Sequence, residues 1–450
     1  MDRVADDDGQ EEEKKENGCL NLCIKMLCFF QLDGVILNDL KFISNLIHQL
    51  MEAVMHKTTR SFISLTVLFV LLISMTGSVF AAPLDAPPSR AKWTVMVYIA
   101  GDNNLEDYVV KDLELELAPT GSSANVQVVA LADRAPGYDT SYGDWQTTKL
   151  FHVTQGMKAD SASAVADWGE RNMGDKQTLI DFVSWTKTNY PADHYALYFW
   201  GHGWNWHPGW VMLDDTSNDT LDMDEVKAAL PAIGFIDMVG FDGCNMASIE
   251  VQMLWRGHAT ALSHSQEYVG WDGIEYDLVL ARLAANPNMT ADAVAIATSQ
   301  SASNDKTWSA VAVDARFDAL ITAVDQWSVA LYNGLAANRS KYDRAFGATR
   351  SFWQAPMDKD LYDMAYEINR LVSDTNIKSK SQAVMNAVNA VVLHERHVNA
   401  YSDVHGITIY HISKASEKDA DYLYYRAMLD FALQTNWDEF LNAYAASGKQ

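Results

Sequence analysis

The stretch Gly240-Phe241-Asp242-Gly243-Cys244-Asn245-Met246 follows the apolar run 235–239 and predicts a buried strand that ends in a tight turn. Such a turn is typical of α/β proteins that present a reactive side chain at one edge of a sheet. Cys244 is the only cysteine after residue 81 of this 450-residue chain. An isolated cysteine is more often a small buried hydrophobe. Because glycine and aspartate are poor core residues, we interpret Cys244 as a nucleophile.

A histidine with similar surroundings precedes this cysteine in the chain. The run Tyr195-Ala196-Leu197-Tyr198-Phe199-Trp200 predicts a buried strand, and Gly201-His202-Gly203 follows it directly. Flanking glycines let the backbone approach a substrate, and an imidazole can accept a thiol proton near neutral pH. If the two strands are adjacent and parallel, His202 and Cys244 lie at the same edge of the sheet.

Composition limits the class of protein. Apolar residues make up 48% of the chain and charged residues 21%, which is typical of a globular protein with a substantial core. The formal net charge of −25 argues against nucleic acid as a partner and favours basic substrates. Acidic residues spread evenly over the surface would give the same net charge.

The first 91 residues are interpreted in three pieces. Residues 55–81 combine Lys57 and Arg60 with an apolar run and small residues before a cleavage point after Ala81, the pattern of a signal peptide. An uncleaved membrane anchor is the alternative, although the apolar run is short for a span. Residues 1–54 are either an extension or a mis-assigned start, and 82–91 form a leader. We therefore expect a secreted or periplasmic protein, with a signal anchor if residues 1–54 are real.

From residue 92 onward, apolar strands alternate with amphipathic helices. This order predicts an α/β fold with a mostly parallel sheet and helices on both faces over residues 92–300. After residue 300 helical patterns dominate, so 301–450 is predicted to be a mainly helical part of the same unit. The expected strands are 93–100, 126–131, 195–200, 235–239, 259–262, 309–313 and 406–410, with a hairpin arm at 145–153.

Four stretches, in this order, resemble the clostripain family of cysteine peptidases in the caspase-like clan. They are 93–105 (WTVMVYIAGDNNL), 169–174 (GERNMG), 200–203 (WGHG) and 242–247 (DGCNMA). The resemblance implies a caspase-like fold and hydrolysis of peptide bonds through a thioester, with Cys244 as the nucleophile and His202 as the base. It also implies an oxyanion hole built from the backbone N–H groups of Gly203 and Cys244. The family pattern usually has a leucine-like residue where this chain has Asn245.

The resemblance further implies cleavage after Arg or Lys, through an acidic pocket for the substrate side chain. Asp242 matches the acidic position of the family motif, since its carboxylate can pair with a cation. The alternative is a structural aspartate that holds the turn. Asp272 is a second candidate for this pocket, and Ser265, Gln266 and Glu267 are expected to line the same wall.

No cofactor is required by the sequence, although calcium is possible because some relatives need it. Asp214, Asp215 and Asp219 are candidate ligands, but their spacing does not follow an EF-hand loop and solvated turn residues are the alternative. We expect protein or peptide substrates, no nucleic acid and a monomer. A secreted binding protein on an inactive peptidase scaffold is the alternative function, and a cysteine-dependent transpeptidase is a third.

Overall fold

The computed structural model describes residues 90–448 apart from 210, 303–304 and 354. The described residues form one compact unit. The predicted extension, the signal peptide and all but the last two residues of the leader lie outside the described residues. Among the helices that are described, none is both long and apolar enough to cross a lipid bilayer.

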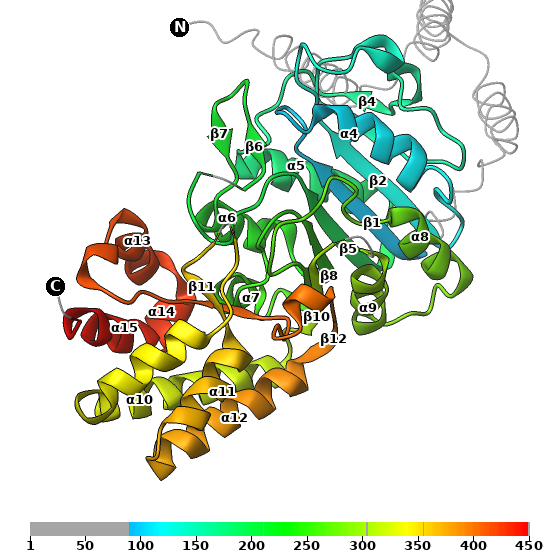
Figure 1. Cartoon of the computed structure of the whole chain (residues 1–450). Coiled ribbons are helices and arrows are strands. Elements are labelled where there is room, and N and C mark those ends of the chain that lie inside the picture. The colour runs from blue at the N-terminus through cyan, green and yellow to red at the C-terminus, as the bar shows by residue number, and fades with distance from the viewer. Residues whose placement is uncertain (1–89, 210, 303–304, 354, 449–450) are drawn as a thin grey trace, which may run out of the picture. The chain divides into compact units, whose positions relative to one another are not determined.

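A nine-stranded sheet organises the described part of the chain (Figure 1). Five neighbouring strands in its centre are parallel, and antiparallel strands complete both edges. The mostly parallel sheet predicted from the alternating pattern is therefore confirmed. In spatial order the strands are β12 (Val392–His397), β10 (Thr307–Ala312), β9 (Ala259–His264), β8 (Ile236–Asp242), β5 (Ala192–Trp200), β1 (Ala91–Ile99), β2 (Val126–Ala132), β3 (Lys149–His152) and β4 (Ala166–Asp167).

Helices cover both faces of the sheet, as the sequence predicts. Successive side chains of a strand point to opposite faces, and in β1 Met96 and Tyr98 pack in one hydrophobic core while Val95 and Val97 pack in the other. The second core is closed by α4 (Glu106–Lys111), the π-helical turn η1 (Asp112–Leu117), α8 (Tyr276–Ala285) and α9 (Ala291–Ser301). The first is closed by α5 (Lys176–Asn189), α6 (Met223–Ile233) and α7 (Ile249–Trp255).

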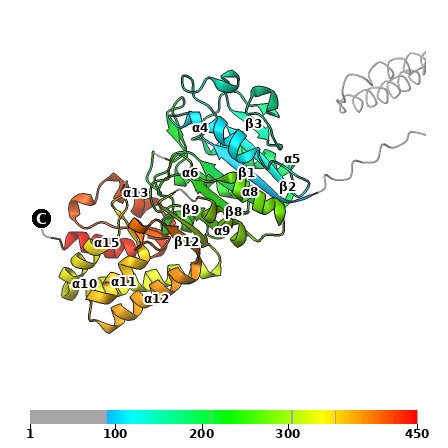
Figure 2. The ribbon, with the colours of Figure 1, turned by 45° about the vertical axis from the view of Figure 1, so that its right-hand side comes forward.

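The C-terminal part is mainly helical and extends the first core. Its helices lie together at one end of the described structure (Figure 2). They are α10 (Ala315–Ala348), α11 (Leu361–Leu371), α12 (Thr375–Val391), α13 (Ala420–Met428), α14 (Asp430–Gln434) and α15 (Trp437–Ala446). Strands β10 and β12 join the main sheet, whereas β11 (Asp358–Asp360) and β13 (Thr408–Tyr410) pair with each other. A second small hairpin consists of β6 (Leu213–Asp214) and β7 (Asp219–Thr220).

Candidate active site

The register of two parallel strands brings His202 and Cys244 to one edge of the sheet. Trp200 at the end of β5 pairs with Asp242 at the end of β8, and the Gly201 N–H donates to the Asp242 carbonyl at 3.1 Å. His202 and Cys244 each lie two residues beyond this pair. Both line the same cavity, which encloses about 540 Å³ when its solvent-open space is counted. The predicted adjacency of the two strands is confirmed.

Glycines allow the two turns to pack backbone against backbone. A Cβ atom on Gly203 would lie 2.8 Å from the Cys244 carbonyl oxygen and 3.0 Å from its nitrogen, and one on Gly243 would lie 3.0 Å from the Gly201 oxygen. Within the described residues, neither the Gly203 N–H nor the Cys244 N–H has a backbone acceptor. The two N–H groups are thus neighbouring donors beside the thiol.

A single hydrogen bond fixes which nitrogen of His202 carries the proton. Nε2 lies 2.8 Å from Oδ1 of Asn104, an atom that only accepts, so Nε2 is the donor. In the neutral ring Nδ1 is then unprotonated and able to take a proton. Burial lowers the pKa of His202, and the nearby Asp215 carboxylate offsets part of this change. The imidazole is therefore neutral at pH 7.

Cys244 is half-buried and its thiol is protonated at rest. Burial raises its pKa to about 11, and the nearby backbone N–H of Val269 offsets part of this. The next residue, Asn245, has a φ of +61°, in the left-handed region that asparagine tolerates better than most residues. Its N–H donates to the Glu267 carbonyl at 3.1 Å and its side chain to the Gln266 carbonyl at 3.0 Å. These contacts hold the turn that presents the thiol.

Two carboxyl groups form the floor of the cavity. Asp242 accepts from the Ile274 N–H at 3.2 Å, and burial raises its pKa to about 7. Asp112 accepts from the indole N–H of Trp200 at 2.7 Å. Burial, reinforced by the negative charge of Asp242, raises the pKa of Asp112 well above its usual range. Asp242 is therefore about half-ionised at neutral pH, and burial favours the protonated form of Asp112.

Aromatic side chains form the walls above this floor. Tyr108 from α4 stacks on Trp271 with ring centres 5.3 Å apart, and Tyr268 and Trp200 complete the lining. Flat apolar walls with an acidic floor fit a long side chain that ends in a cation. Sequence reasoning did not identify Asp112. The available signal was a carboxylate among the apolar residues Val109, Val110 and Leu113.

The other residues expected in the substrate pocket lie elsewhere. Asp272 is exposed at the rim, where its carboxylate pairs with Lys111 at 3.3 Å, and it does not line the cavity. Ser265, Gln266 and Glu267 are buried and lie outside the cavity lining, because their side chains bond to neighbouring segments of the fold.

These three residues connect the turn after Cys244 to the C-terminal part. Gln266 donates to the Asp360 carboxylate at 3.0 Å and accepts from the Gly406 N–H at 2.7 Å. Glu267 accepts from the Trp353 N–H at 3.1 Å and the Tyr401 hydroxyl at 2.9 Å. The contacts indicate a role in holding the site together.

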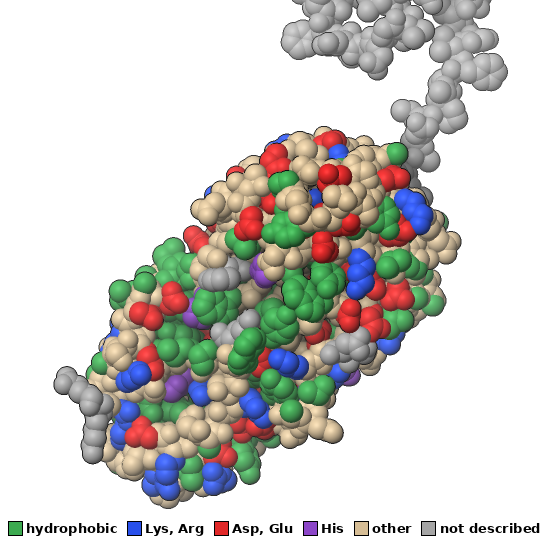
Figure 3. All heavy atoms as spheres, turned by 45° about the horizontal axis from the view of Figure 1, so that its top comes forward, with side chains coloured by type: hydrophobic (Ala, Val, Ile, Leu, Met, Phe, Trp, Pro, Cys, Tyr) green, Lys and Arg blue, Asp and Glu red, His purple; other side chains and the backbone are tan. Residues whose placement is uncertain are grey.

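Acidic residues beyond the cavity divide into separate groups. Asp214 lies in a cluster with Asp102, Asp133 and Glu170, whereas Asp215 and Asp219 are not part of it. Burial, with the negative charge of Glu170, raises the pKa of Asp133 in this cluster to about 9. On the face shown in Figure 3, acidic and basic side chains are scattered with hydrophobic ones between them. No single acidic patch dominates that face.

Comparison with known proteins gives consistent matches. The model of the clostripain family matches residues 97–444. Clostripain from Hathewaya histolytica is 30% identical over 223 residues, a match that covers 43% of this chain and 42% of that protein. The chain thus spans about two fifths of the length of this relative.

Two solved structures are similar in fold. One is a secreted C11 cysteine protease from Bacteroides thetaiotaomicron in complex with an irreversible peptide inhibitor. Its TM-score is 0.60 at 17% sequence identity, and the match covers 78% of this chain and 100% of that one. The other is an inactive zymogen C11 protease from Parabacteroides distasonis, with a TM-score of 0.58, 18% identity, and coverage of 79% and 99%. These likenesses confirm the expected caspase-like architecture.

Proposed function

Because the chain belongs to the clostripain family, we propose that it is a cysteine endopeptidase in which Cys244 and His202 form the catalytic dyad. The observation that carries this proposal is their shared position: both line one cavity at the ends of adjacent parallel strands, above an acidic floor. The comparisons support the class of enzyme, and the geometry supports the assignment of roles to these residues.

Proton transfer to the histidine starts the proposed reaction. Nδ1 of His202 takes the Cys244 proton as the sulfur attacks the substrate carbonyl carbon, because both groups are neutral at rest. The carbonyl electrons move to oxygen, and the N–H groups of Gly203 and Cys244 donate to this oxyanion. The imidazolium then protonates the leaving amine, and the C–N bond breaks to give a thioester. Water, deprotonated by His202, hydrolyses the thioester and restores the thiol.

The resting thiol has consequences for the timing of this step. A pKa of about 11 means that little thiolate exists in the free enzyme at pH 7. The proton is therefore transferred during attack, and Asn104 keeps the imidazole in the tautomer that accepts it at Nδ1. Asn104 is a positioning residue in this proposal, since it acts through His202.

We further propose that the substrate residue before the cleaved bond is Lys or Arg. Its aliphatic stem would lie against the stacked rings of Tyr108 and Trp271, and its cation would meet Asp242. Burial favours a protonated Asp112, so an ionised Asp242 would offer one negative charge to one positive charge and no buried charge would be left unpaired. This pairing of charges supports a basic substrate residue over an acidic one.

We also propose that the protein is exported from the cell that makes it. The signal-peptide pattern of residues 55–81 supports secretion, and one similar structure is described as a secreted protease. The only described cysteine is free, so the fold does not depend on an oxidising compartment.

A panel of fluorogenic peptides tests the proposed activity. The chain from Ala82 should cleave peptides that end in Arg or Lys before the fluorophore, and should be slow on peptides ending in Asn or Asp. Cys244→Ala should remove the activity. If no peptide is cleaved but the substrates still bind, the alternative of a binding protein on a peptidase scaffold replaces this proposal.

A further inference from the structure

A lysine without a charged partner lies at the rim of the active-site cavity. The ammonium group of Lys306 is 5.3 Å from the ring centre of Tyr268, which lines the cavity, and 5.8 Å from that of Trp353. Lys111, at another part of the rim, pairs with Asp272 at 3.3 Å, whereas the Lys306 ammonium has no ion pair and no hydrogen bond within the described residues. It is therefore free to bind a negative group of a ligand.

Two aromatic side chains hold this ammonium group in position. Tyr268 and Trp353 meet edge to face with ring centres 6.3 Å apart, and a cation close to both rings is attracted by each. The backbone N–H of Trp353 donates to Oε2 of the buried Glu267 at 3.1 Å, which anchors it beside Tyr268. Trp353 is 71% exposed, the largest value among the large hydrophobic residues that the structure describes. Such an exposed aromatic surface beside a cavity is typical of a binding site.

The order of the strands places Lys306 on one side of the thiol. Strands β5, β8, β9 and β10 are consecutive neighbours in the sheet. His202 follows β5, and Cys244 follows β8. Tyr268 follows β9, and Lys306 directly precedes β10, which is antiparallel to β9 and so begins at the same edge. Cys244 thus lies between His202 on one side and the Tyr268–Lys306 pair on the other.

This order determines which part of a substrate meets Lys306. In the proposed reaction His202 protonates the leaving amine, so the residues after the cleaved bond lie on the β5 side of the thiol. The residues before the cleaved bond then run toward β9 and β10. Neighbouring strands are about 4.8 Å apart, which puts the start of β10 roughly 10 Å from the end of β8. One or two extended residues and a side chain span that distance.

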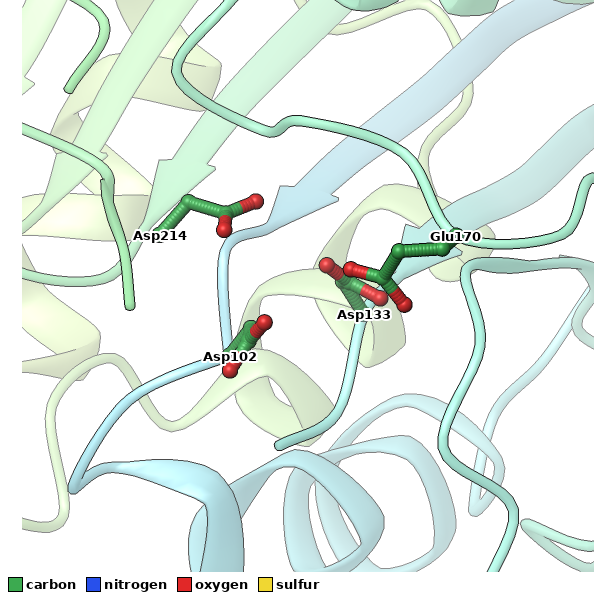
Figure 4. A group of neighbouring side chains, drawn as sticks. All are labelled: Asp102, Asp133, Glu170 and Asp214. Atoms are coloured by element: carbon green, nitrogen blue, oxygen red, sulfur yellow. The ribbon is translucent and has the colours of Figure 1, made fainter. Parts of the chain in front are cut away.

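The two sides of this edge also differ in charge. Four carboxyl groups, among them Asp102 after β1 and Asp133 after β2, converge on the far side of β5 (Figure 4). On the β10 side, Asp305 is next to Lys306 in sequence, but it is only 3% exposed and its Oδ1 accepts from the Gly270 N–H at 2.6 Å. Lys306 therefore presents a positive charge to the part of the substrate before the cleaved bond.

We propose that Lys306, supported by Tyr268 and Trp353, binds an acidic side chain of the substrate at one of the two positions directly before the basic residue. The carboxylate of this Asp or Glu pairs with the ammonium group, and its aliphatic stem packs on the exposed indole of Trp353. The preferred substrate is then a peptide in which an acidic residue precedes Lys or Arg by one or two positions. This inference rests on the proposed function, because the direction of the substrate follows from the role of His202.

Fluorogenic peptides that end in lysine and carry Glu, Gln or Lys at either of the two preceding positions test the selectivity. At one of these positions, wild-type kcat/KM should be about fivefold higher for Glu than for Gln, and about tenfold higher than for Lys, because an exposed ion pair is weak. Roughly 1 M NaCl should reduce both ratios to below twofold, since salt screens exposed charges. Lys306→Gln should remove the preference for Glu, and Lys306→Glu should reverse it in favour of Lys.

Lys380→Glu is the matched control, because it changes the net charge by the same amount as Lys306→Glu. Lys380 lies in α12, away from the cavity lining, and its ammonium group donates to Oε1 of Gln326 at 2.7 Å. This variant should keep the wild-type preference. The Gln peptide has no charge for residue 306 to meet, so every variant should cleave it within about threefold of the wild-type rate.

Two results would overturn the inference while leaving the proposed function intact. One is equal cleavage of the Glu, Gln and Lys peptides at both positions, and the other is an unchanged preference in Lys306→Glu. If no peptide is cleaved, the proposed function fails, and binding of the same peptides to the Cys244→Ala chain, measured by fluorescence anisotropy, decides the inference separately. A preference for Glu that Lys306→Glu reverses would support it, whereas no binding, or binding that ignores this charge, would refute it.

Discussion

Asp112 and Asp242 are the residues on which the proposed substrate preference depends. They come from η1 and from the end of β8, and both line the cavity. Because burial favours the protonated form of Asp112 while Asp242 is ionised above a pH of about 7, Asp242 is the group that we propose meets the cation. Substitution of this one carboxylate should therefore change selectivity more than it changes catalysis.

Asp242→Asn should reduce kcat/KM about 100-fold for a peptide ending in lysine, because the cation would enter a buried pocket without its charged partner. For the same peptide with norleucine in place of lysine, kcat/KM should fall by less than about threefold. Asp272→Asn is the matched control and should change neither value by more than about threefold, since its exposed pair with Lys111 contributes little. An equal loss on both peptides in Asp242→Asn would instead favour the structural role of this aspartate.

The same two peptides should differ in their pH dependence. Asp242 has a raised pKa of about 7, so it is neutral below that pH and ionised above it. For the lysine peptide, kcat/KM should fall as the pH drops through about 7. For the norleucine peptide, kcat/KM should fall only below pH 6.5, because 6.5 is the ordinary pKa of histidine and burial lowers the pKa of His202 from it. Superimposable profiles for the two peptides would contradict the assigned role of Asp242.

Some residues of the site were predictable from local sequence and others were not. His202, Cys244 and Asp242 lie at strand ends framed by glycines, a signal that needs only neighbouring residues. Asp112 lies in η1, far in sequence from these strand ends, so its place in the site depends on how η1 packs against the sheet. Gln266 follows β9 closely, yet its bonds reach Asp360, which no local pattern indicates.

At the scale of elements, the turns after β5 and β8 form one structure. Gly203 lies against the backbone of Cys244, so the two proposed oxyanion donors keep their spacing only without a side chain at 203. Gly347 in α10 provides a comparison, since a Cβ atom there meets nothing within 4 Å.

Gly203→Ala should lower kcat by about 100-fold or more, because displacement of the Cys244 backbone removes an oxyanion donor from its position. Steady-state kinetics on the lysine peptide would measure this. Gly347→Ala should keep wild-type kinetics and gain about 0.5–1 kcal/mol of stability in urea unfolding, because alanine favours the exposed helix. Wild-type kcat in Gly203→Ala would rule out the proposed oxyanion hole.

The strands and helices that the sequence predicted are those with clear apolar periodicity. The five central parallel strands are buried on both faces and therefore contain long apolar runs, which makes them easy to predict. Strand β12 was missed because its residues Leu393-His394-Glu395-Arg396-His397 are mostly polar, as an edge strand allows. Helix α10 is continuous over Ala315–Ala348, since packing against the other C-terminal helices stabilises its polar second half.

For the whole molecule, the connection between the His and Cys strands bears on whether the chain is cut before it becomes active. Residues 203–226 contain no Lys or Arg, and Lys227 is the first basic residue. Lys227 lies within α6, where its ammonium group pairs with Asp430 at 2.8 Å. A helical backbone is a poor protease substrate because cleavage requires an extended chain.

We therefore expect the chain of the active enzyme to be uncut between Gly203 and Asp242. Denaturing mass spectrometry of protein that turns over substrate should show no new terminus in that interval. Two fragments that together carry the activity, with a new N-terminus between these residues, would refute the expectation.

The central claim is that Cys244, activated by His202, attacks the substrate carbonyl. The most direct measurement is intact-mass spectrometry of the chain from Ala82 after incubation with a peptide chloromethyl ketone ending in lysine, followed by peptide mapping. The account predicts one adduct per chain, located on Cys244, with complete loss of turnover. Cys244→Ala should form no adduct, and His202→Ala should form it at least 100-fold more slowly. An adduct at another residue, or turnover that survives complete labelling of Cys244, would contradict the account.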